Sequence, residues 1–277
     1  MIEIWKPYSV HGVDYEVSKS IISMESQKTD CRMKMTCIGT GSSGNAYVLQ
    51  NEQEALVIEA GMPISDVLKA LNYSTRKVVG CIVSHGHLDH IKYIEDYCKF
   101  FKCYCSQGTI GEFEWKHQRR PRVLEVLKTV QIGGFRVRPI PAEHDAAEPF
   151  AYIIDHADFG RLLFATDTYY LRYRIPDMTA IMIECNYSLP ILNENVERGI
   201  VPVALKNRTL DSHMSLEHLK EMLAANDLTR VTQIVIIHLS ARNSDAGAFC
   251  REIIEQTGKS TTYAQKGLTI ELNRTPF

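Results

Sequence analysis

The 277-residue sequence contains no long apolar run and no recognisable secretory segment. No stretch approaches the roughly 20 consecutive apolar residues that a transmembrane helix needs. The first seven residues, MIEIWKP, lack both the basic start and the continuous apolar stretch of a signal peptide. These absences predict a cytoplasmic protein with no membrane partner.

The sequence also lacks a surplus of charge, because 31 Lys and Arg residues stand against 33 Asp and Glu residues. A nucleic-acid enzyme with this balance needs a local basic stripe, since contacts to phosphates depend on clustered Lys and Arg. The one compact candidate contains Arg119, Arg120 and Arg122, with Lys116 and His117 beside them. A solvated loop or helix end accounts for these residues equally well.

The spacing of the eight cysteines matches no standard zinc pattern. Cys37, Cys81 and Cys185 lie in apolar runs, where a free thiol behaves as a small hydrophobic side chain. The stretch 98–105, which contains three cysteines, is the part of the sequence most similar to a zinc knuckle. No second pair of Cys or His ligands follows it at the spacing that such a site needs. Neither a disulfide framework nor structural zinc is expected.

The remaining composition is that of a globular protein, with 45% hydrophobic residues. Residues 1–32 are polar and weakly periodic, and we interpret them as an N-terminal extension before a single domain at 33–277. Apolar runs typical of strands occupy residues 35–39, 46–49, 55–58, 78–83, 135–140, 150–154, 161–165, 180–183 and 233–237. Helices are predicted after Pro63, at 216–225 and at 246–257. Strands dominate both halves and helices cover them, which predicts an α/β sandwich of sheets.

The strongest chemical signal is the run SHGHLDH at residues 84–90, directly after a buried strand. Residues two apart in an extended segment face the same side, so His85 and His87 are placed to grip one ion. Asp89 and His90, turning into the next helix, are placed to grip a second. Imidazole and carboxylate ligands together suit zinc, manganese or iron. A core histidine usually occurs singly, which makes a purely structural origin of this cluster improbable.

Three further candidates also follow predicted strands, namely His144, Asp167 and His238. Strand ends at one rim of a sheet are where side chains converge into a rigid site. Any one of these residues alone is more often structural than functional. Their repetition at successive strand ends favours a shared metal site.

With these residues in place, the sequence resembles the metallo-β-lactamase superfamily, whose hallmark is His-x-His-x-Asp-His. The resemblance implies a four-layered αβ/βα sandwich and two divalent metal ions, zinc or manganese. It implies that one ion is held by His85, His87 and His144, the other by Asp89, His90 and His238, and that Asp167 bridges both. It also implies a metal-bound hydroxide as the attacking group.

Within the superfamily, the chain is similar to the YycJ/WalJ-like subgroup of single-domain nucleases over roughly residues 35–245. The similarity rests on the Gly/Ser turn at 39–45, on HDAAEP at 144–149, on TDT at 166–168, on ECN at 184–186, on DSHMS at 211–215 and on HLS at 238–240. By analogy with the related tRNase Z enzymes, Glu184 would orient His213, which would act as general acid. Asp89, Glu184 and His213 are the implied catalytic residues. A structural role for His213, just before a helix cap at Ser215, is the competing interpretation.

One position departs from the family pattern, because Glu59 stands where the family usually has Asp. That acid orients a ligand, and a longer side chain could shift the geometry. No ligand of the first coordination sphere is missing. An active enzyme is therefore expected, and homodimers are frequent among relatives, so a homodimer is expected as well.

The resemblance favours a DNA exonuclease that cuts in the 5′-to-3′ direction. The alternative is a phosphodiesterase for small cyclic nucleotides, which viral relatives use to degrade a defence signal. That alternative fits the near-neutral charge, and Tyr169, Tyr170 and Tyr173 could stack on a base. The same tyrosines could equally be core or dimer contacts.

Overall fold

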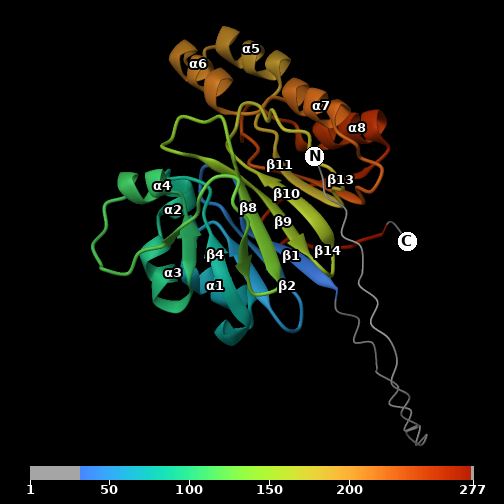
Figure 1. Ribbon diagram of the computed structural model, residues 1–277. Coiled ribbons are helices and arrows are strands. Elements are labelled where there is room, and N and C mark those ends of the chain that lie inside the picture. The colour runs from blue at the N-terminus through green and yellow to red at the C-terminus, as the bar shows by residue number, and fades with distance from the viewer. Residues whose placement is uncertain (1–31, 276–277) are drawn as a thin grey trace, which may run out of the picture. The chain divides into compact units, whose positions relative to one another are not determined.

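The computed structural model describes residues 32–275, so the predicted N-terminal extension lies outside the described residues apart from Arg32. Two seven-stranded sheets form the centre of the fold (Figure 1). The strands of the first sheet run in the order β14 (Thr269–Leu272), β1 (Met33–Gly39), β2 (Ala46–Gln50), β3 (Ala55–Ile58), β4 (Val78–Ile82), β5 (Cys103–Cys105) and β6 (Arg122–Val123). Those of the second run in the order β13 (Ser260–Tyr263), β12 (Gln233–Ile237), β11 (Ala180–Glu184), β10 (Gly160–Ala165), β9 (Phe150–His156), β8 (Phe135–Pro141) and β7 (Val130–Ile132).

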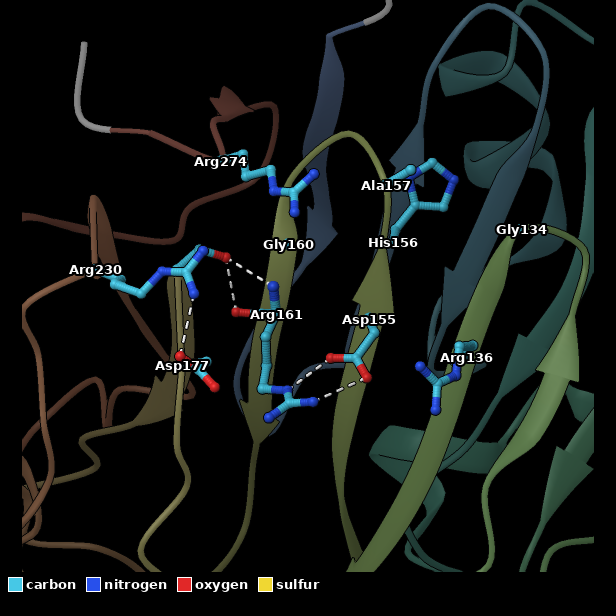
Figure 2. A pocket seen from close by; sticks show the side chains of 11 residues that line it. Gly134, Arg136, Asp155, His156, Ala157, Gly160, Arg161, Asp177, Arg230 and Arg274 are labelled. Atoms are coloured by element: carbon cyan, nitrogen blue, oxygen red, sulfur yellow. Dashed lines mark hydrogen bonds and ion pairs between the residues drawn. The ribbon is translucent and has the colours of Figure 1, made fainter. Parts of the chain in front are cut away.

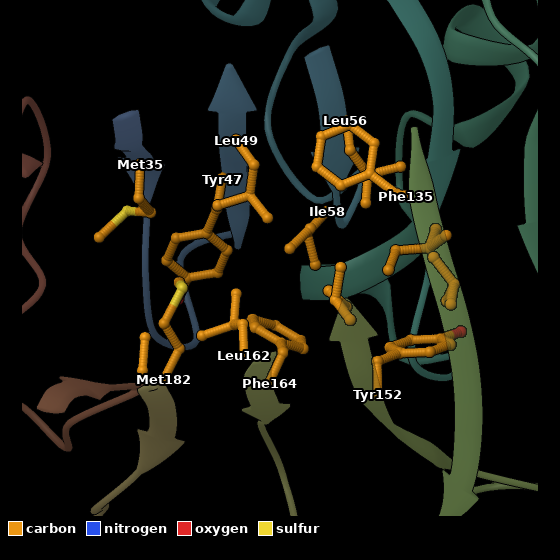
Figure 3. Close-up of a cluster of buried hydrophobic side chains, with 14 of the residues drawn as sticks. Met35, Tyr47, Leu49, Leu56, Ile58, Phe135, Tyr152, Leu162, Phe164 and Met182 are labelled. Atoms are coloured by element: carbon orange, nitrogen blue, oxygen red, sulfur yellow. The ribbon is translucent and has the colours of Figure 1, made fainter. Parts of the chain in front are cut away.

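The two sheets face each other across the main hydrophobic core, because side chains alternate between the two faces of each strand. In β2, for example, Tyr47 and Leu49 point into this core, whereas Val48 faces the opposite way. Figure 3 shows such side chains from the first sheet opposite Leu162 and Phe164 of β10. Tyr47 and Phe164 meet edge-to-face, with ring centroids 5.7 Å apart.

Helices cover the outer face of each sheet and complete four layers. The first sheet is covered by α1 (Ile64–Ala70), α2 (Leu88–Ile91) and α3 (Ile94–Phe100), which share one apolar cluster with β2, β3 and β4. The second is covered by α7 (Leu216–Ala225) and α8 (Ala246–Thr257). The predicted four-layered α/β sandwich is therefore confirmed, as are the positions of α1, α7 and α8.

Several elements were not predicted from the sequence. They include α4 (Gln107–Glu112) and the pair α5 (Leu189–Glu197) and α6 (Val203–Ser212), which lie together next to α7 in Figure 1. The pair lies between β11 and His213. No helix within residues 32–275 is both long enough and apolar enough to cross a membrane.

Candidate metal centre

The candidate residues lie where the strands of both sheets end at one rim. In the first sheet, β3 and β4 run parallel, and residues 84–90 follow β4. In the second, β10, β11 and β12 run parallel, and they end next to Asp167, Glu184 and His238 respectively. His144 follows β8. Parallel strands bring their carboxyl ends to one edge, so residues distant in sequence meet there.

The structure brings all seven predicted ligands together in two overlapping groups. The first contains His85, His87, His144 and Asp167, and the second contains Asp89, His90, Asp167 and His238. Within each group, one nitrogen or oxygen atom per residue lies within 4.8 Å of the others. Asp167 belongs to both groups and stands between them.

Two of the histidine side chains, His144 and His85, are held from outside by one nitrogen and leave the other for the centre. Nδ1–H of His144 donates to the carbonyl of Ser212 at 2.7 Å, which leaves a lone pair on Nε2. That Nε2 lies only 3.1 Å from Nδ1 of His87. Nδ1 of His85 bonds to Ser84 Oγ at 2.9 Å, and its Nε2 is buried without a hydrogen-bond partner. Converging lone pairs and an unpartnered buried nitrogen are the chemistry that a divalent ion satisfies.

The carboxylate of Asp167 lies at the middle of this arrangement. Its Oδ2 is 3.4 Å from Nε2 of His90, 3.6 Å from Nε2 of His144 and 3.7 Å from Nε2 of His85. Burial alone would raise the pKa of Asp167, but the surrounding imidazoles, His238 foremost, hold it well below its ordinary value. The site therefore favours the ionised form of Asp167, which is the form that binds a metal ion.

Glu59 occupies the position where the sequence departs from the family pattern. Its side chain is fully buried, and its carboxylate accepts from the backbone N–H of Ser84 at 3.3 Å. The same carboxylate lies 3.4 Å from Nδ1 of His90. The longer side chain of Glu59 thus still approaches a histidine that is predicted to bind metal, although Nδ1 of His90 makes no hydrogen bond to it among the described residues.

Three residues of the site adopt left-handed backbone conformations that are unusual for residues other than glycine. Glu59, Asp167 and His238 have φ values of 68°, 32° and 53°, and each directly follows a strand or lies two residues beyond it. Such conformations cost about 1–3 kcal/mol each and concentrate at functional sites. The fold therefore uses strained strand ends to aim these side chains into the centre.

Sequence analysis did not find the role of Asn45, which lies in the Gly/Ser turn after β1. Its Nδ2 is 3.0 Å from Nε2 of His90 and 3.3 Å from the carbonyl of Asp89. Gly61 allows this approach, because a Cβ there would stand 1.7 Å from the carbonyl oxygen of Asp89. The cluster of turn residues at 39–45 was the only sequence signal for a role of Asn45. Sequence spacing does not reveal that Asn45 contacts Asp89, which is 44 residues away.

Glu184 and His213 form a pair beside the centre. Nδ1 of His213 lies 2.7 Å from Oε1 of Glu184, while Oε2 accepts from the backbone N–H groups of Thr168 and Met214. Burial alone would lower the pKa of His213, but the carboxylate of Glu184 raises it above its ordinary value. The side chain of Ser215 caps α7 by accepting from the N–H of His218, as the competing interpretation of His213 expects. The catalytic interpretation of His213 therefore depends on its contact with Glu184.

A cavity of about 350 Å³ opens over the centre. Its walls include His87, Asp89, Asp167, His213 and His238, with Leu205, Arg208 and Thr209 supplied by α6. Nε of Arg208 donates to Oδ2 of Asp145 at 2.9 Å, next to the ligand candidate His144. The three tyrosines at 169, 170 and 173 do not line this cavity. Tyr169 and Tyr170 instead contact His218, and Tyr173 packs against the core under α7.

This sandwich, with its buried His/Asp cluster at one rim, defines a hydrolase of the metallo-β-lactamase fold. A family model described as the beta-lactamase superfamily domain matches residues 62–239, more than half of the chain. The protein belongs to this superfamily. The predicted superfamily and the predicted divalent-metal chemistry of the cluster agree with this finding.

Two relatives place the chain more narrowly. It is 25% identical over 228 residues to exodeoxyribonuclease WalJ of Streptococcus pneumoniae, a match that covers 76% of this chain and 83% of the relative. It is 25% identical over 227 residues to exodeoxyribonuclease YycJ of Bacillus anthracis, covering 76% and 84%. Among solved structures, the metallo-β-lactamase-fold protein YhfI of Bacillus subtilis superposes with a TM-score of 0.67 at 17% identity. That superposition covers 87% of this chain and 99% of the other.

Proposed function

We propose that the protein is a dinuclear metal-dependent phosphodiesterase that acts on DNA as an exonuclease. The observation that carries the proposal is the Glu184–His213 hydrogen bond of 2.7 Å, placed directly beside the His/Asp cluster. Hydrolysis of a phosphodiester needs positive charge on the phosphoryl oxygens and a proton for the departing oxygen. The cluster would supply the first requirement and His213 the second, and both line one cavity.

Two ions, zinc or manganese, fit the site because the ligand candidates divide into two groups that share Asp167. His85, His87 and His144 would hold one ion, and Asp89, His90 and His238 the other. Divalent ions there would neutralise phosphoryl charge and lower the pKa of a coordinated water. The outer partners Ser84, Ser212 and Glu59 keep the imidazoles in the required orientation.

In this proposal His213 is the general acid. Because its Nδ1 faces Glu184, its Nε2 is left for the cavity, which His213 lines. The buried carboxylate of Glu184 favours the protonated imidazole, so the proton is available at the side of the departing oxygen. Glu184 acts through His213 and is therefore a positioning residue.

DNA is preferred over a cyclic nucleotide as the substrate for two reasons. Both relatives that match most of the chain are named exodeoxyribonucleases. The cavity also offers no aromatic platform for an enclosed base, since its apolar walls are Leu88 and Leu205. The predicted homodimer belongs to this proposal as well, and sedimentation of the purified chain would test it.

The deciding experiment compares two substrates in the presence of Mn²⁺ or Zn²⁺. One is duplex DNA labelled at a 5′ end, and the other is a panel of cyclic nucleotides. Progressive release of label from DNA, with no turnover of cyclic nucleotides, is the expected result. Turnover of cyclic nucleotides alone would replace the exonuclease with a small-nucleotide phosphodiesterase.

A further inference from the structure

A second cavity, of about 340 Å³, lies at the β5–β6 edge of the first sheet. Its lining contains five cationic side chains and no carboxylate, and we call it the basic pocket: Cys98, Lys99, Phe100, Phe101, Lys102, Cys103, Arg119, Arg120 and Arg122. Of the five cations, Lys99 pairs with Asp96 at 2.7 Å. Lys102 and Arg122 have no acidic side chain within 4 Å among residues 32–275. In a chain whose net charge is −2, this is a local surplus of positive charge.

A pocket at the ends of β8, β9 and β10 that are opposite the metal centre provides a comparison for this surplus of positive charge (Figure 2). That pocket also contains four arginines, but two of them are neutralised. Arg161 lies 2.7 Å from Asp155, and Arg230 lies 3.1 Å from Asp177. Two of the four arginines there are balanced by carboxylates of the lining, whereas the lining of the basic pocket has no carboxylate.

The basic pocket also carries an exposed aromatic ring on a fixed framework. Phe100, the last residue of α3, is 55% exposed. Arg119 Nη1 donates to the carbonyl of Lys99 at 3.0 Å, and the guanidinium of Arg120 lies 4.6 Å from the ring centroid of Trp115. The contact of Arg119 ties the 116–122 segment to α3, so cations and aromatic ring are presented together. A positive groove with an exposed aromatic is the chemistry that holds a nucleic-acid strand by its phosphates and a stacked base.

The register of the sheet relates one residue of the basic pocket, Arg122, to the metal centre, whereas Lys102 precedes β5 at the end of that short strand away from the centre. Ile82 pairs with Tyr104, and Tyr104 pairs with Arg122, so Arg122 is level with Ile82, two residues before Ser84. Two strand spacings and two residues correspond to about 12 Å between Arg122 and Ser84. A short run of nucleotides spans a distance of this order.

We propose that the basic pocket binds the phosphodiester backbone of the DNA substrate, with one base stacked on Phe100. The proposal rests on the proposed function, and it names the surface on which the polymer lies. It also explains how a chain without a net positive charge holds a polyanion. A membrane is a poorer occupant, because the pocket is hollowed and Phe100 is its one strongly exposed apolar residue.

The test is binding of a fluorescent single-stranded oligonucleotide with hydrolysis-resistant phosphorothioate linkages, measured by anisotropy at several salt concentrations. The test variant is Lys102→Ala/Arg122→Ala. The matched control is Arg136→Ala/Arg274→Ala in the pocket of Figure 2, which also removes two cations without an acidic partner among the described residues. In the test variant the affinity should fall at least about tenfold. The slope of log K against log[salt] should shrink by about 1.4, which corresponds to two phosphate contacts.

The control variant should keep both the affinity and the salt slope of the wild-type protein. Phe100→Ala should weaken binding about fivefold or more without changing the slope, because it removes stacking but no charge. Equal losses in the two double variants, or an unchanged slope in Lys102→Ala/Arg122→Ala, would overturn the proposal. So would preferential binding of the wild-type protein to vesicles of anionic lipid. Turnover of the small ester bis(p-nitrophenyl) phosphate by the wild-type protein tests the proposed function separately.

Discussion

Glu184 Oε1 lies 2.7 Å from Nδ1 of His213 and 2.9 Å from Nδ1 of His238. One buried carboxylate thus contacts both the residue proposed as general acid and a residue proposed to bind metal. This shared contact fixes the position of His213 relative to the centre. A catalytic group must be held in a fixed orientation to the reacting atoms. It also means that changes at Glu184 and at His213 should have different consequences.

Replacing His213 with Ala should remove most of the catalytic rate while leaving the metal in place. Loss of a general acid costs about 10²- to 10⁴-fold in rate. The two groups proposed to hold metal do not contain His213, although a third possible group joins it to Asp167, Glu184 and His238. Metal content measured by mass spectrometry should match the wild-type protein if the first two groups bind the metal. Substantial metal loss in His213→Ala would assign this residue to coordination instead.

His87→Ala should differ from His213→Ala by losing metal as well as turnover. His87 belongs to the first group of candidate ligands, and its Nδ1 lies 3.1 Å from Nε2 of His144. The first group contains no further described residue that could take over its place as a ligand. His117→Ala is the control, since His117 is exposed and far along the chain from both groups. Normal metal content in His87→Ala would contradict its placement as a ligand.

The sequence predicted the fold class, and it singled out seven candidate ligands that the structure brings together, because both leave local signals. The strand β4 lies in a continuous apolar run of the sequence, and SHGHLDH follows that run directly. His144, Asp167 and His238 each stand just past a recognisable strand. What the sequence did not reveal depends on tertiary contacts. Asn45 and Ser212 act on ligands that are 45 and 68 residues away, and no spacing rule connects them.

Glu59→Gln should weaken metal binding while leaving the fold intact. Gln keeps the volume of the side chain and an acceptor for the N–H of Ser84, but it removes the negative charge next to His90. Loss of such an outer partner typically costs 10- to 100-fold in metal affinity. Affinity would be measured by competition with a chromogenic chelator.

A matched control for this substitution is Glu54→Gln. Glu54 also lies beside a histidine, with Oε1 3.1 Å from Nε2 of His156, but at the opposite end of the second sheet. It should leave metal affinity unchanged. Equal effects of the two substitutions would indicate general loss of stability rather than orientation of His90.

The helices α5 and α6 were missed because their apolar residues form no stripe as regular as that of α8. Their position nevertheless brings Leu205, Arg208 and Thr209 to the wall of the cavity. Which side chains reach the cavity depends on where the helix packs, and this cannot be predicted from the composition of the helix. The wall of the cavity was therefore the least predictable part of the site.

Arg208→Ala should raise KM for DNA about tenfold and leave kcat nearly unchanged. Arg208 lines the cavity and is held by Asp145 at 2.9 Å, which suits contact with a substrate phosphate rather than with the reacting atoms. The expected effect is moderate because the side chain is largely exposed. Lys206→Ala on the same helix is the control, because Lys206 does not line the cavity. A fall in kcat with unchanged KM would move Arg208 into the chemical step.

The buried thiol of Cys37 should make the protein less stable at alkaline pH. Burial raises the pKa of Cys37 from 9.0 to about 12. Below pH 9 the thiol is protonated in both the folded and the unfolded chain, so its contribution to stability is complete. Between pH 9 and pH 12 only the unfolded chain releases the proton, and the free energy of unfolding falls with rising pH. For one group the slope approaches about 1.4 kcal/mol per pH unit.

Cys37→Ala removes this titration from the core between the two sheets. The variant should be less stable at pH 8, because it loses buried apolar volume. Its free energy of unfolding should, however, decline more slowly between pH 9 and pH 11 than that of the wild-type protein. Urea unfolding at pH 8, 9, 10 and 11 measures both effects. Parallel pH dependences in the two proteins would mean that another buried group, such as Tyr47, whose pKa burial also raises, sets the alkaline limit.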